Sequence, residues 1–483
     1  MSSHKWTRRQ HLACGLVSLS VVLIIPHAVS DKLHARIRAS LANTNTWAGP
    51  SFSANSIVNV NPGALSDSLR HFLSSTIGVS DANNHSTTIE TTLPLPHPPP
   101  GFAIFDRLYV RNKTFYAVTS DPGAYPDLMY VLTQPADMGR GDISPTEKEM
   151  QLISPEDAQG ILRSHAVVLR GMSYVVYDTA QFMKHYYHWW GEIILGAVRV
   201  YSTLSLILGP LPDPARFLLP NIHDHSWRDR AGVDGPLMRA AWPNTPIERG
   251  DFWNDTAALN QTFVFERAMI ISRPAAHKSP FGSVWYKMIA GTMNITAPAN
   301  FWDPVRRRVV LNTIGYLPVV TNEGTVLSAP RSAAPVVTYI SRQRAGRSFL
   351  PAAHDSLVKA LQELHDQGVC EFVEVAMEKM TFAAQVELAA RTTIMIGIHG
   401  NGLTHQLWMP QSPRSTVIEV FWPESYAHDY SMLSRNMGHK HYAVWNDTYL
   451  TYPEGEWFHG ISYGPGFHGG KLSFRRTILL SSD

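Results

Sequence analysis

The chain has 483 residues, 44% of them hydrophobic, which is enough for two or three domains with a sizeable core. Its 41 Lys and Arg residues nearly balance 39 Asp and Glu residues, giving a formal net charge of +2. Because nucleic-acid binding needs a basic face and none is visible, nucleic acid is excluded as an expected partner.

The first 30 residues have the pattern of a targeting segment. Basic residues at positions 5, 8 and 9 precede an apolar run over residues 12–25, and Ala-Val-Ser at 28–30 resembles a small-residue cleavage site. Two interpretations stay open: a cleaved signal peptide, or an uncleaved single-pass anchor with a cytoplasmic N-terminus. Either one brings the chain into the secretory pathway. No later stretch is expected to cross a membrane.

Cysteine and Asn usage agree with that address. Cys14 lies in the apolar segment and Cys370 in a predicted strand, so no intrachain disulfide is expected. Six Asn-x-Ser/Thr sequons are potential glycosylation sites: Asn84, Asn112, Asn254, Asn260, Asn294 and Asn446.

Residues 31–100 are rich in Ser, Asn, Thr and Pro, with scattered apolar residues, and end in a proline-rich run. This composition predicts a disordered stem that holds a folded domain away from a membrane.

A first α/β domain is expected over residues 101–333. The apolar patterns predict strands at 102–110, 114–119, 128–132, 166–169, 172–177, 216–219 and 263–272, and helices at 182–208 and 284–293. Residues 228–260 are turn-rich and are expected at the surface.

A second α/β domain is expected over residues 334–450, followed by an extension, 451–483, that packs back on the fold. Strands are predicted at 336–340, 369–375, 394–398, 416–421 and 441–444, and helices at 352–367, 382–391 and 426–437. This alternation predicts a parallel sheet, whose ligands bind beyond the carboxyl ends of the strands. The loops after residues 340, 398 and 420 should therefore meet in one crevice.

The loop after residue 398 has the composition of an anion site. Gly400 and Gly402 let the backbone approach a ligand closely, and the unpaired amides of the next helix attract negative charge such as a phosphate. His399 is the side chain there that can donate to a diphosphate. An ordinary strand-to-helix turn is the alternative.

Two neighbouring strand ends carry charges that fit such a ligand. After residue 340 come Arg342, Arg344 and Arg347, whose guanidinium groups match phosphate oxygens; a solvated basic loop is the alternative. Glu419 interrupts an apolar strand, and its carboxylate can accept from ribose hydroxyls. Because a buried unpaired acid is costly, a ligand or a nearby Arg should satisfy it.

The first domain offers an acid–base pair at the start of its long helix. His188 and Glu192 are four residues apart and share a face, where they can take a proton from a hydroxyl group. Two alternatives stay open: a core helix in which the two side chains only bond each other, or a metal site using His185 and His188. His223-Asp224-His225 is a similar, weaker candidate.

Two formal motif matches are rejected. Gly460-Ile-Ser462-Tyr-Gly464 fits a hydrolase pattern, and residues 464–469 fit a dinucleotide pattern, but neither lies between a strand and a helix. The chain has no Asp-x-Asp pair, the usual metal-chelating acids for a nucleotide diphosphate. Arginines and helix amides would have to supply the positive charge.

Taken together, four ordered motifs resemble glycosyltransferase family 61: His399-Gly-Asn-Gly-Leu-Thr-His405, Val417-Ile-Glu-Val420, Tyr339-Ile-Ser-Arg342 with Arg347, and Tyr187-His-Trp189 with Glu192. The resemblance covers roughly residues 166–445. The family includes plant xylosyl- and arabinosyltransferases and animal enzymes that place N-acetylglucosamine on extracellular domains or O-mannose.

The resemblance implies a GT-B architecture, in which two Rossmann-like domains face a central cleft, and metal-independent, inverting transfer of xylose, N-acetylglucosamine or arabinose from a UDP-sugar. No metal or other cofactor is expected. The acceptor would be a hydroxyl of a glycan or glycoprotein, and the protein a type II membrane protein of the Golgi or endoplasmic reticulum with a luminal catalytic domain.

The same resemblance assigns site residues by position. His399, Gly400 and Gly402 would line the diphosphate pocket, Arg342 and Arg347 would neutralise it, and Glu419 would face the ribose. Glu192 or His188 would be the base, with Glu192 preferred. Departures are His185, where the family often has Asn, and Asn401, where it commonly has Ala. The alternative function is an inactive, transferase-like carbohydrate-binding protein of the secretory pathway; a hydrolase built on Ser462 is a remote third.

Overall fold

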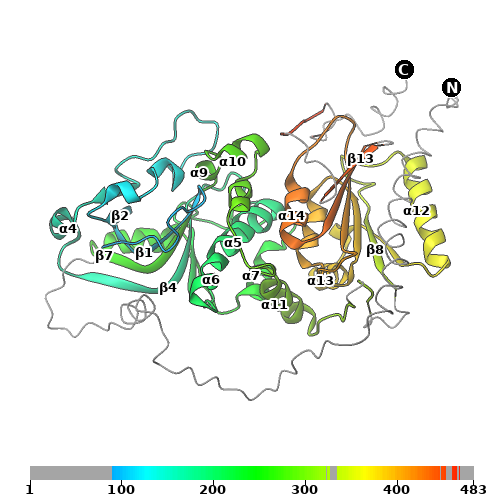
Figure 1. Cartoon of the computed structure of the whole chain (residues 1–483), viewed down its shortest axis with the longest axis horizontal. Helices are drawn as coiled ribbons and strands as arrows, with labels where there is room; N and C mark the ends of the chain where they lie inside the picture. Colours follow the sequence, from blue (N-terminus) through cyan, green and yellow to red (C-terminus); the bar gives the residue numbers. More distant parts are fainter. Residues whose placement is uncertain are drawn as a thin grey trace, which may run out of the picture.

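The computed structural model describes residues 90–321, 324–326, 334–445, 448–452, 460–464 and 467. Two β-sheets lie at opposite sides of these residues, with helices packed between them (Figure 1). The strands and helices form a Rossmann-like α/β fold, as the alternation of patterns predicts.

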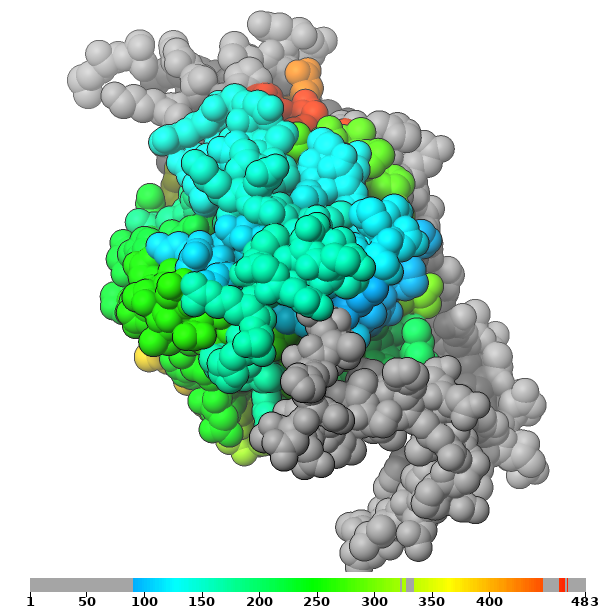
Figure 2. Space-filling view, turned by 90° about the vertical axis from the view of Figure 1, so that its left-hand side faces the viewer, coloured from blue at the N-terminus to red at the C-terminus, as the bar shows by residue number. Residues whose placement is uncertain are grey.

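The first sheet has seven strands in the order β3-β2-β1-β7-β4-β5-β6. Their bounds are β1 Phe102–Arg111, β2 Thr114–Val118, β3 Met150–Ile153, β4 Ala166–Val176, β5 Arg216–Leu218, β6 Ile247–Glu248 and β7 Thr262–Ile271. β7, β4, β5 and β6 pair in parallel, whereas β1 is antiparallel to both β2 and β7. The sheet of this half is therefore mixed, with a parallel part. Figure 2 shows the face of the molecule on this side, where the blue and cyan segments form much of the surface.

The helical elements of this half lie between its strands in the chain or follow β7. They are η2 Pro122–Ala124, η3 Leu128–Tyr130, α4 Pro155–Leu162, η4 Tyr187–Ile194, α5 Leu195–Thr203, α6 Ser205–Leu208, α7 Asp234–Ala241, α8 Gly250–Ala258, α9 Arg273–Ala276, α10 Pro280–Trp285, η5 Met288–Asn294 and α11 Asp303–Ile314. η4 is a π-helix, so the predicted long helix begins with a wider turn than the α-helix that follows it.

Several predictions for this half were wrong in detail. Residues 128–132 hold a 3-10 turn, because Asp127 caps it through the amide of Met129. The two strands expected at 166–177 are one strand with an irregularity between Leu169 and Met172. The helix expected at 284–293 is divided at Tyr286. The turn-rich stretch 228–260 contributes two helices, α7 and α8, which bury Leu237, Met238 and Trp253.

The second sheet has six strands in the order β13-β12-β11-β10-β8-β9. Their bounds are β8 Val336–Ile340, β9 Glu371–Val375, β10 Ile394–Ile398, β11 Thr416–Val420, β12 Lys440–Trp445 and β13 Thr448–Tyr452. All pair in parallel except β13, which runs antiparallel to β12. The chain order reverses between β8 and β10, and at such a switch point the loops beyond the strands diverge and leave a crevice for a ligand.

The helices of this half are α12 Pro351–Asp366, η6 Met377–Lys379, α13 Phe382–Arg391, η7 Asn401–Trp408 and α14 Asp429–Met437. Their positions agree closely with the predicted pattern. The Thr381 hydroxyl caps α13 by accepting from the amide of Ala384, and this is the capping expected from a Thr at that position.

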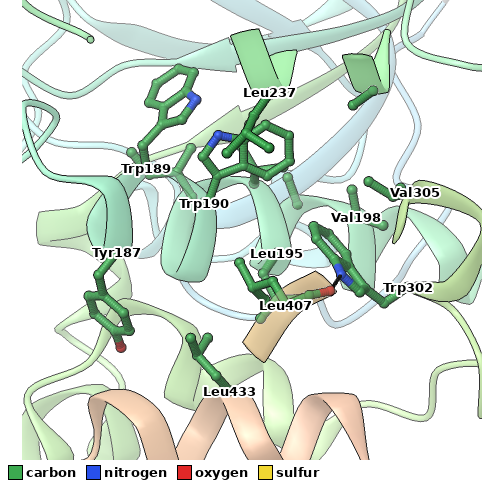
Figure 3. Close-up of a cluster of buried hydrophobic side chains, with 14 of the residues drawn as sticks. Tyr187, Trp189, Trp190, Leu195, Val198, Leu237, Trp302, Val305, Leu407 and Leu433 are labelled. Atoms are coloured by element: carbon green, nitrogen blue, oxygen red, sulfur yellow. Dashed lines mark hydrogen bonds between the residues drawn. The ribbon is translucent and has the colours of Figure 1, made fainter. Parts of the chain in front are cut away.

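The two halves share one continuous hydrophobic core. Trp190 of η4 lies with its ring 5.3 Å from that of Trp408 in η7. Figure 3 shows the hydrogen bond that Trp302 donates from its indole N–H to the carbonyl of Leu407, at 2.9 Å. Leu433 of α14 belongs to the same cluster. Separating the halves would expose these large rings to water, so packing fixes their relative position.

The folded region begins earlier than the predicted stem boundary at residue 100. Thr91 is 3% exposed and its amide donates to the carbonyl of Val118, while Thr92 bridges to Asp106. These backbone hydrogen bonds extend the β1–β2 edge, so residues 90–100 are part of the fold. The targeting segment and residues 31–89 lie outside the described residues.

One described helical stretch, Tyr187–Leu208, is long and apolar enough to span a membrane, contrary to the expectation that none would follow residue 30. Within its most apolar 18-residue window 67% is buried, and most of its apolar residues belong to the shared core. Of the potential glycosylation sites, Asn112, Asn254, Asn260 and Asn294 are exposed, while Asn84 and Asn446 lie outside the described residues. Cys370 is a buried free thiol.

Candidate active site

The Gly loop leaves β10 at the switch point and contacts the loop after β8. A Cβ on Gly400 would lie 1.5 Å from Nη1 of Arg342, so the absence of a side chain lets this guanidinium lie against the loop backbone. A Cβ on Gly402 would lie 2.9 Å from Cγ2 of Ile340. Gly400 therefore admits Arg342, whereas Gly402 permits close packing on the end of β8.

Arg342 and Arg347 come together as predicted from their strand-end position. Each donates through Nη1 to the carbonyl oxygen of His399, at 2.7 and 2.8 Å respectively. Burial lowers the pKa of the Arg342 guanidinium, and the charge of Arg347 lowers it further. Two positive charges therefore lie close together. Each guanidinium uses one of its five N–H groups to bind the loop, so its remaining donors can bind an anion.

Glu419 does not have the environment predicted for it. It is fully buried, and its two carboxylate oxygens contact His399 Nδ1 at 2.5 Å and His441 Nε2 at 2.8 Å. Two histidines therefore satisfy this acid, where a ligand or an arginine was expected. Both oxygens are occupied, so Glu419 is not placed to accept from a ribose.

The His399 ring is held on its other sides by aromatic rings. Those of Phe421 and Tyr430 both lie 5.2 Å away, and that of Phe467 lies at 4.7 Å. Burial lowers the pKa of His399 to about 3, and burial raises the pKa of Glu419 well above its ordinary value. Both shifts favour a neutral imidazole beside a neutral carboxylic acid. His399 is 7% exposed, so little of its side chain is open to a ligand.

In the first half, His188 and Glu192 form the predicted pair. Nδ1 of His188 lies 2.6 Å from Oε2 of Glu192, and the same oxygen lies 2.5 Å from Nη1 of Arg273. The other oxygen accepts from the amide of Met288 at 3.0 Å. Burial raises the pKa of Glu192, but Arg273 and His188 outweigh it and hold the pKa well below its ordinary value.

These contacts reverse the expected order of the two candidate bases. Glu192 is 1% exposed, ionised and fully hydrogen-bonded, so it is a weak proton acceptor. His188 has 23% of its side chain exposed, and burial lowers its pKa although Glu192 raises it. With Nδ1–H donating to Glu192, the free nitrogen Nε2 of a neutral His188 can accept a proton.

Two contacts of Tyr187 join the helix that carries His188 to the Gly loop and its surroundings. Asn401 of the loop accepts from the amide of Tyr187 through Oδ1 at 3.1 Å and thereby caps η4. The Tyr187 ring lies 5.5 Å from that of Tyr430, which also contacts His399. The two groups that the sequence predicts separately therefore meet at one interface.

A buried ion pair lies at the same interface. Nζ of Lys287 is 3.0 Å from Oδ2 of Asp429, and the two side chains are 6% and 15% exposed. Burial raises the pKa of Asp429, but Lys287, His399 and His188 lower it below its ordinary value. This carboxylate is thus surrounded by groups from both halves.

Sequence reasoning missed Arg273, Lys287, Asp429 and His441. Only Arg273 has a local signal, because it precedes Pro274 directly after a strand and begins α9. The others are single charges in unremarkable contexts, and their partners come from distant segments.

The weaker candidates do not assemble. His185 and His188 have ring centroids 4.9 Å apart, but no group of three or more His, Cys, Asp or Glu within the described ranges is arranged to hold a metal ion. His223, Asp224 and His225 lie in an exposed loop. Ser462 pairs with Tyr426 through the backbone, and its hydroxyl donates to the carbonyl of Glu424, so it has no hydrolase geometry.

The fold and these residues define a Rossmann-like α/β protein with paired arginines at a sheet switch point and a histidine–carboxylate pair on the helix that contacts the same Gly loop. Residues 186–418 match the sequence model of the family Glycosyltransferase 61, which confirms the resemblance. The matched region contains every predicted site residue except Glu419, which follows it directly.

A relative of known name supports the same family. Over 123 residues the chain is 32% identical to an EGF domain-specific O-linked N-acetylglucosamine transferase of Drosophila melanogaster. This alignment covers 26% of the chain and 22% of that protein, so the chain spans about a fifth of the length of the relative it matches.

Proposed function

We propose that the protein is an inverting glycosyltransferase that moves a sugar from a nucleoside diphosphate donor, a UDP-sugar, to a hydroxyl of a glycan or glycoprotein. The observation that carries this proposal is that the helix of His188 is hydrogen-bonded, through the Tyr187 amide, to Asn401 of the Gly loop, and that the His399 carbonyl of the same loop holds Arg342 and Arg347. These segments lie inside a region that matches a glycosyltransferase family. Xylose, N-acetylglucosamine and arabinose are the candidate sugars.

His188 is the proposed base. In an inverting displacement the acceptor oxygen bonds to the anomeric carbon as the bond to the diphosphate breaks, and the hydroxyl proton passes to Nε2 of His188. Glu192 accepts from Nδ1–H, fixes the tautomer and stabilises the imidazolium that forms. Arg273 keeps Glu192 ionised, so that its charge persists throughout the reaction.

Positive charge for the departing diphosphate comes from the second half. Arg342 and Arg347 are fixed on the carbonyl of His399 before any ligand binds, so little reorganisation is needed when negative charge develops on the leaving oxygen. The amides of the Gly loop add to this field. We therefore propose that transfer does not require a divalent metal.

The architecture and cellular address belong to the same proposal. Two sheets that share a ligand-binding interface are consistent with the GT-B arrangement. The basic and apolar N-terminal pattern and the four exposed sequons support a type II membrane protein of the Golgi or endoplasmic reticulum with a luminal catalytic domain. The name of the Drosophila relative supports a protein acceptor and an N-acetylglucosamine donor as the first pair to assay.

The test is turnover in the presence of a chelator. Detergent-solubilised full-length protein is incubated with UDP-xylose, UDP-N-acetylglucosamine or UDP-arabinose, and released UDP is measured with and without candidate acceptors. The proposal expects acceptor-stimulated release that is lost in His188→Ala, with inversion at the anomeric carbon seen by NMR. Donor binding without any release would instead support an inactive carbohydrate-binding protein.

A further inference from the structure

A cavity lies beside the arginine loop, at the carboxyl ends of β8 and β9. Its volume is about 250 Å³, and its lining includes Ser341, Gln343, His354, Glu374, Glu378 and Lys379. Arg344 of the arginine loop also lines it, whereas Arg342, Arg347 and the Gly-loop residues do not. It lies on the β9 side of the Arg342 loop, whereas the Gly loop lies on the β10 side.

The cavity adjoins the proposed diphosphate subsite. Ser341 and Gln343 flank Arg342 in the chain, so one loop forms the wall of the cavity and carries the guanidinium. The Glu378 carboxylate lies within electrostatic range of Arg342: burial and Arg347 lower the pKa of that guanidinium, while Tyr430 and Glu378 raise it. A molecule whose phosphates contact Arg342 can therefore extend directly into the cavity.

The walls of the cavity are held in place by hydrogen bonds. The Gln343 side chain accepts from the amide of Phe349 at 2.9 Å and donates to its carbonyl at 3.2 Å. His354 contacts the Tyr339 hydroxyl through Nδ1 at 3.1 Å and Glu374 through Nε2 at 3.4 Å. Such fixed polar groups around a small cavity are typical of ligand sites.

The chemistry of the lining fits a nucleoside. A carboxylate is the side chain that proteins commonly use to accept from ribose hydroxyls at the strand ends of such sheets. Glu419 is excluded from that role by its two histidine partners, whereas Glu378 is exposed beside Arg342. Glu374 and His354 lie further along the wall. The Glu374 carboxylate can accept hydrogen bonds from the edge of a base, and the His354 ring can contact the base.

We propose that this cavity binds the nucleoside of the donor, with the Glu378 carboxylate accepting from the ribose hydroxyls and the base directed toward Glu374 and His354. This inference rests on the proposed function, because it takes the diphosphate to lie on Arg342 and Arg347.

The experiment compares three probes by calorimetry in the presence of chelator: UDP, 2′-deoxy-UDP and inorganic diphosphate. Wild-type protein should bind UDP more tightly than 2′-deoxy-UDP by roughly tenfold or more, since a hydrogen bond to a charged group is lost. In Glu378→Gln this preference should shrink severalfold, whereas the affinity for inorganic diphosphate should not fall, because the substitution removes a negative charge near Arg342. Glu363→Gln, an exposed substitution on α12 outside the cavity, makes the same change of charge and should retain the preference.

A second variant tests the cavity without altering charge. Ala376 also lines the cavity, and a Trp side chain at this position would fill it. The affinity of Ala376→Trp for UDP should therefore fall to its affinity for inorganic diphosphate. The inference is overturned if Glu378→Gln keeps the full preference for UDP, if Ala376→Trp binds UDP normally, or if wild-type protein binds inorganic diphosphate as tightly as UDP. A different result separates the two proposals. If the protein prefers UDP over 2′-deoxy-UDP and inorganic diphosphate as expected but transfers no sugar, the catalytic proposal fails and the nucleoside site stands.

Discussion

Nδ1 of His188 lies 2.6 Å from Oε2 of Glu192, and the same carboxylate oxygen also contacts Arg273. This arrangement separates two tasks that the sequence alone assigns to either residue. In the proposed mechanism, His188 exchanges the proton, and Glu192 positions and polarises the His188 ring. The two substitutions should therefore have different consequences.

Replacing His188 should abolish most of the turnover while sparing the fold. In His188→Ala we expect kcat to fall by about 10²- to 10⁴-fold, the usual contribution of a general base, with the affinity for UDP little changed. Steady-state kinetics and calorimetry measure the two effects. His223→Ala, in an exposed loop, is the matched control. A variant that kept wild-type kcat would remove His188 from the mechanism.

Replacing Glu192 should instead destabilise the protein. Glu192→Gln leaves the buried Arg273 without its charged partner, and breaking a buried ion pair typically costs about 3–5 kcal/mol. Chemical denaturation should show a loss of that order, with a lower midpoint and an unchanged m-value. Equal stability of the variant and the wild type would mean that Arg273 does not depend on this carboxylate.

The pH dependence of kcat/KM should report His188. Only neutral His188 can act as the base, and burial lowers its pKa below the ordinary value of 6.5. The rate should therefore rise with pH through a midpoint below 6.5 and then reach a plateau. Because Glu192 raises this pKa, Glu192→Gln should move the midpoint to still lower pH. A purely structural role for Glu192 would leave the midpoint where it was.

The arginine pair should determine diphosphate affinity. Arg342→Ala and Arg347→Ala should each lower the affinity for inorganic diphosphate by roughly tenfold or more, because charge-assisted hydrogen bonds contribute about 1.5–3 kcal/mol each. Arg307→Ala, on the exposed side of α11, should leave the affinity unchanged. Titration calorimetry in chelator measures all three. Unchanged binding in both loop variants would place the diphosphate elsewhere.

Buried neutral histidines should make the fold sensitive to acid. Burial lowers the pKa of His399 and His441 to about 3, and that of His405 and His439 to about 4. The unfolded chain binds these protons near pH 6.5, so their contribution to stability is complete above 6.5 and is lost as the pH falls toward 3. Denaturation at several pH values should show the free energy of unfolding declining through this window. A flat profile would contradict the neutral assignment.

How much of this was visible in the sequence differs between the two halves. In the second half, strong alternation of apolar runs and helical patterns places β8, β10 and β11 almost to the residue. Parallel strands bring their carboxyl ends to one edge, so Arg342, Arg347 and the Gly loop could be expected to meet. In the first half, antiparallel strands and short helices give weaker patterns, and α7 and α8 were not recognised.

The role of Glu419 shows why the site was harder to predict than the fold. The sequence places an acid in an apolar strand and requires a partner for it, but it does not say which one. β12 supplies His441, and the Gly loop supplies His399 from the other side. These contacts depend on strand register and side-chain direction. Similarly, Glu192 acquires Arg273 from a segment 81 positions later in the chain.

The central claim is that paired arginines bind a nucleoside diphosphate without a divalent metal. The most direct measurement is the thermal unfolding of the full-length protein in chelator, with and without UDP. At a UDP concentration a hundred times its dissociation constant, the free energy of unfolding should increase by about 2.7 kcal/mol, and added Mn²⁺ or Mg²⁺ should not change this gain. If no nucleoside diphosphate stabilises the protein, or if stabilisation appears only with a divalent metal, the claim is wrong.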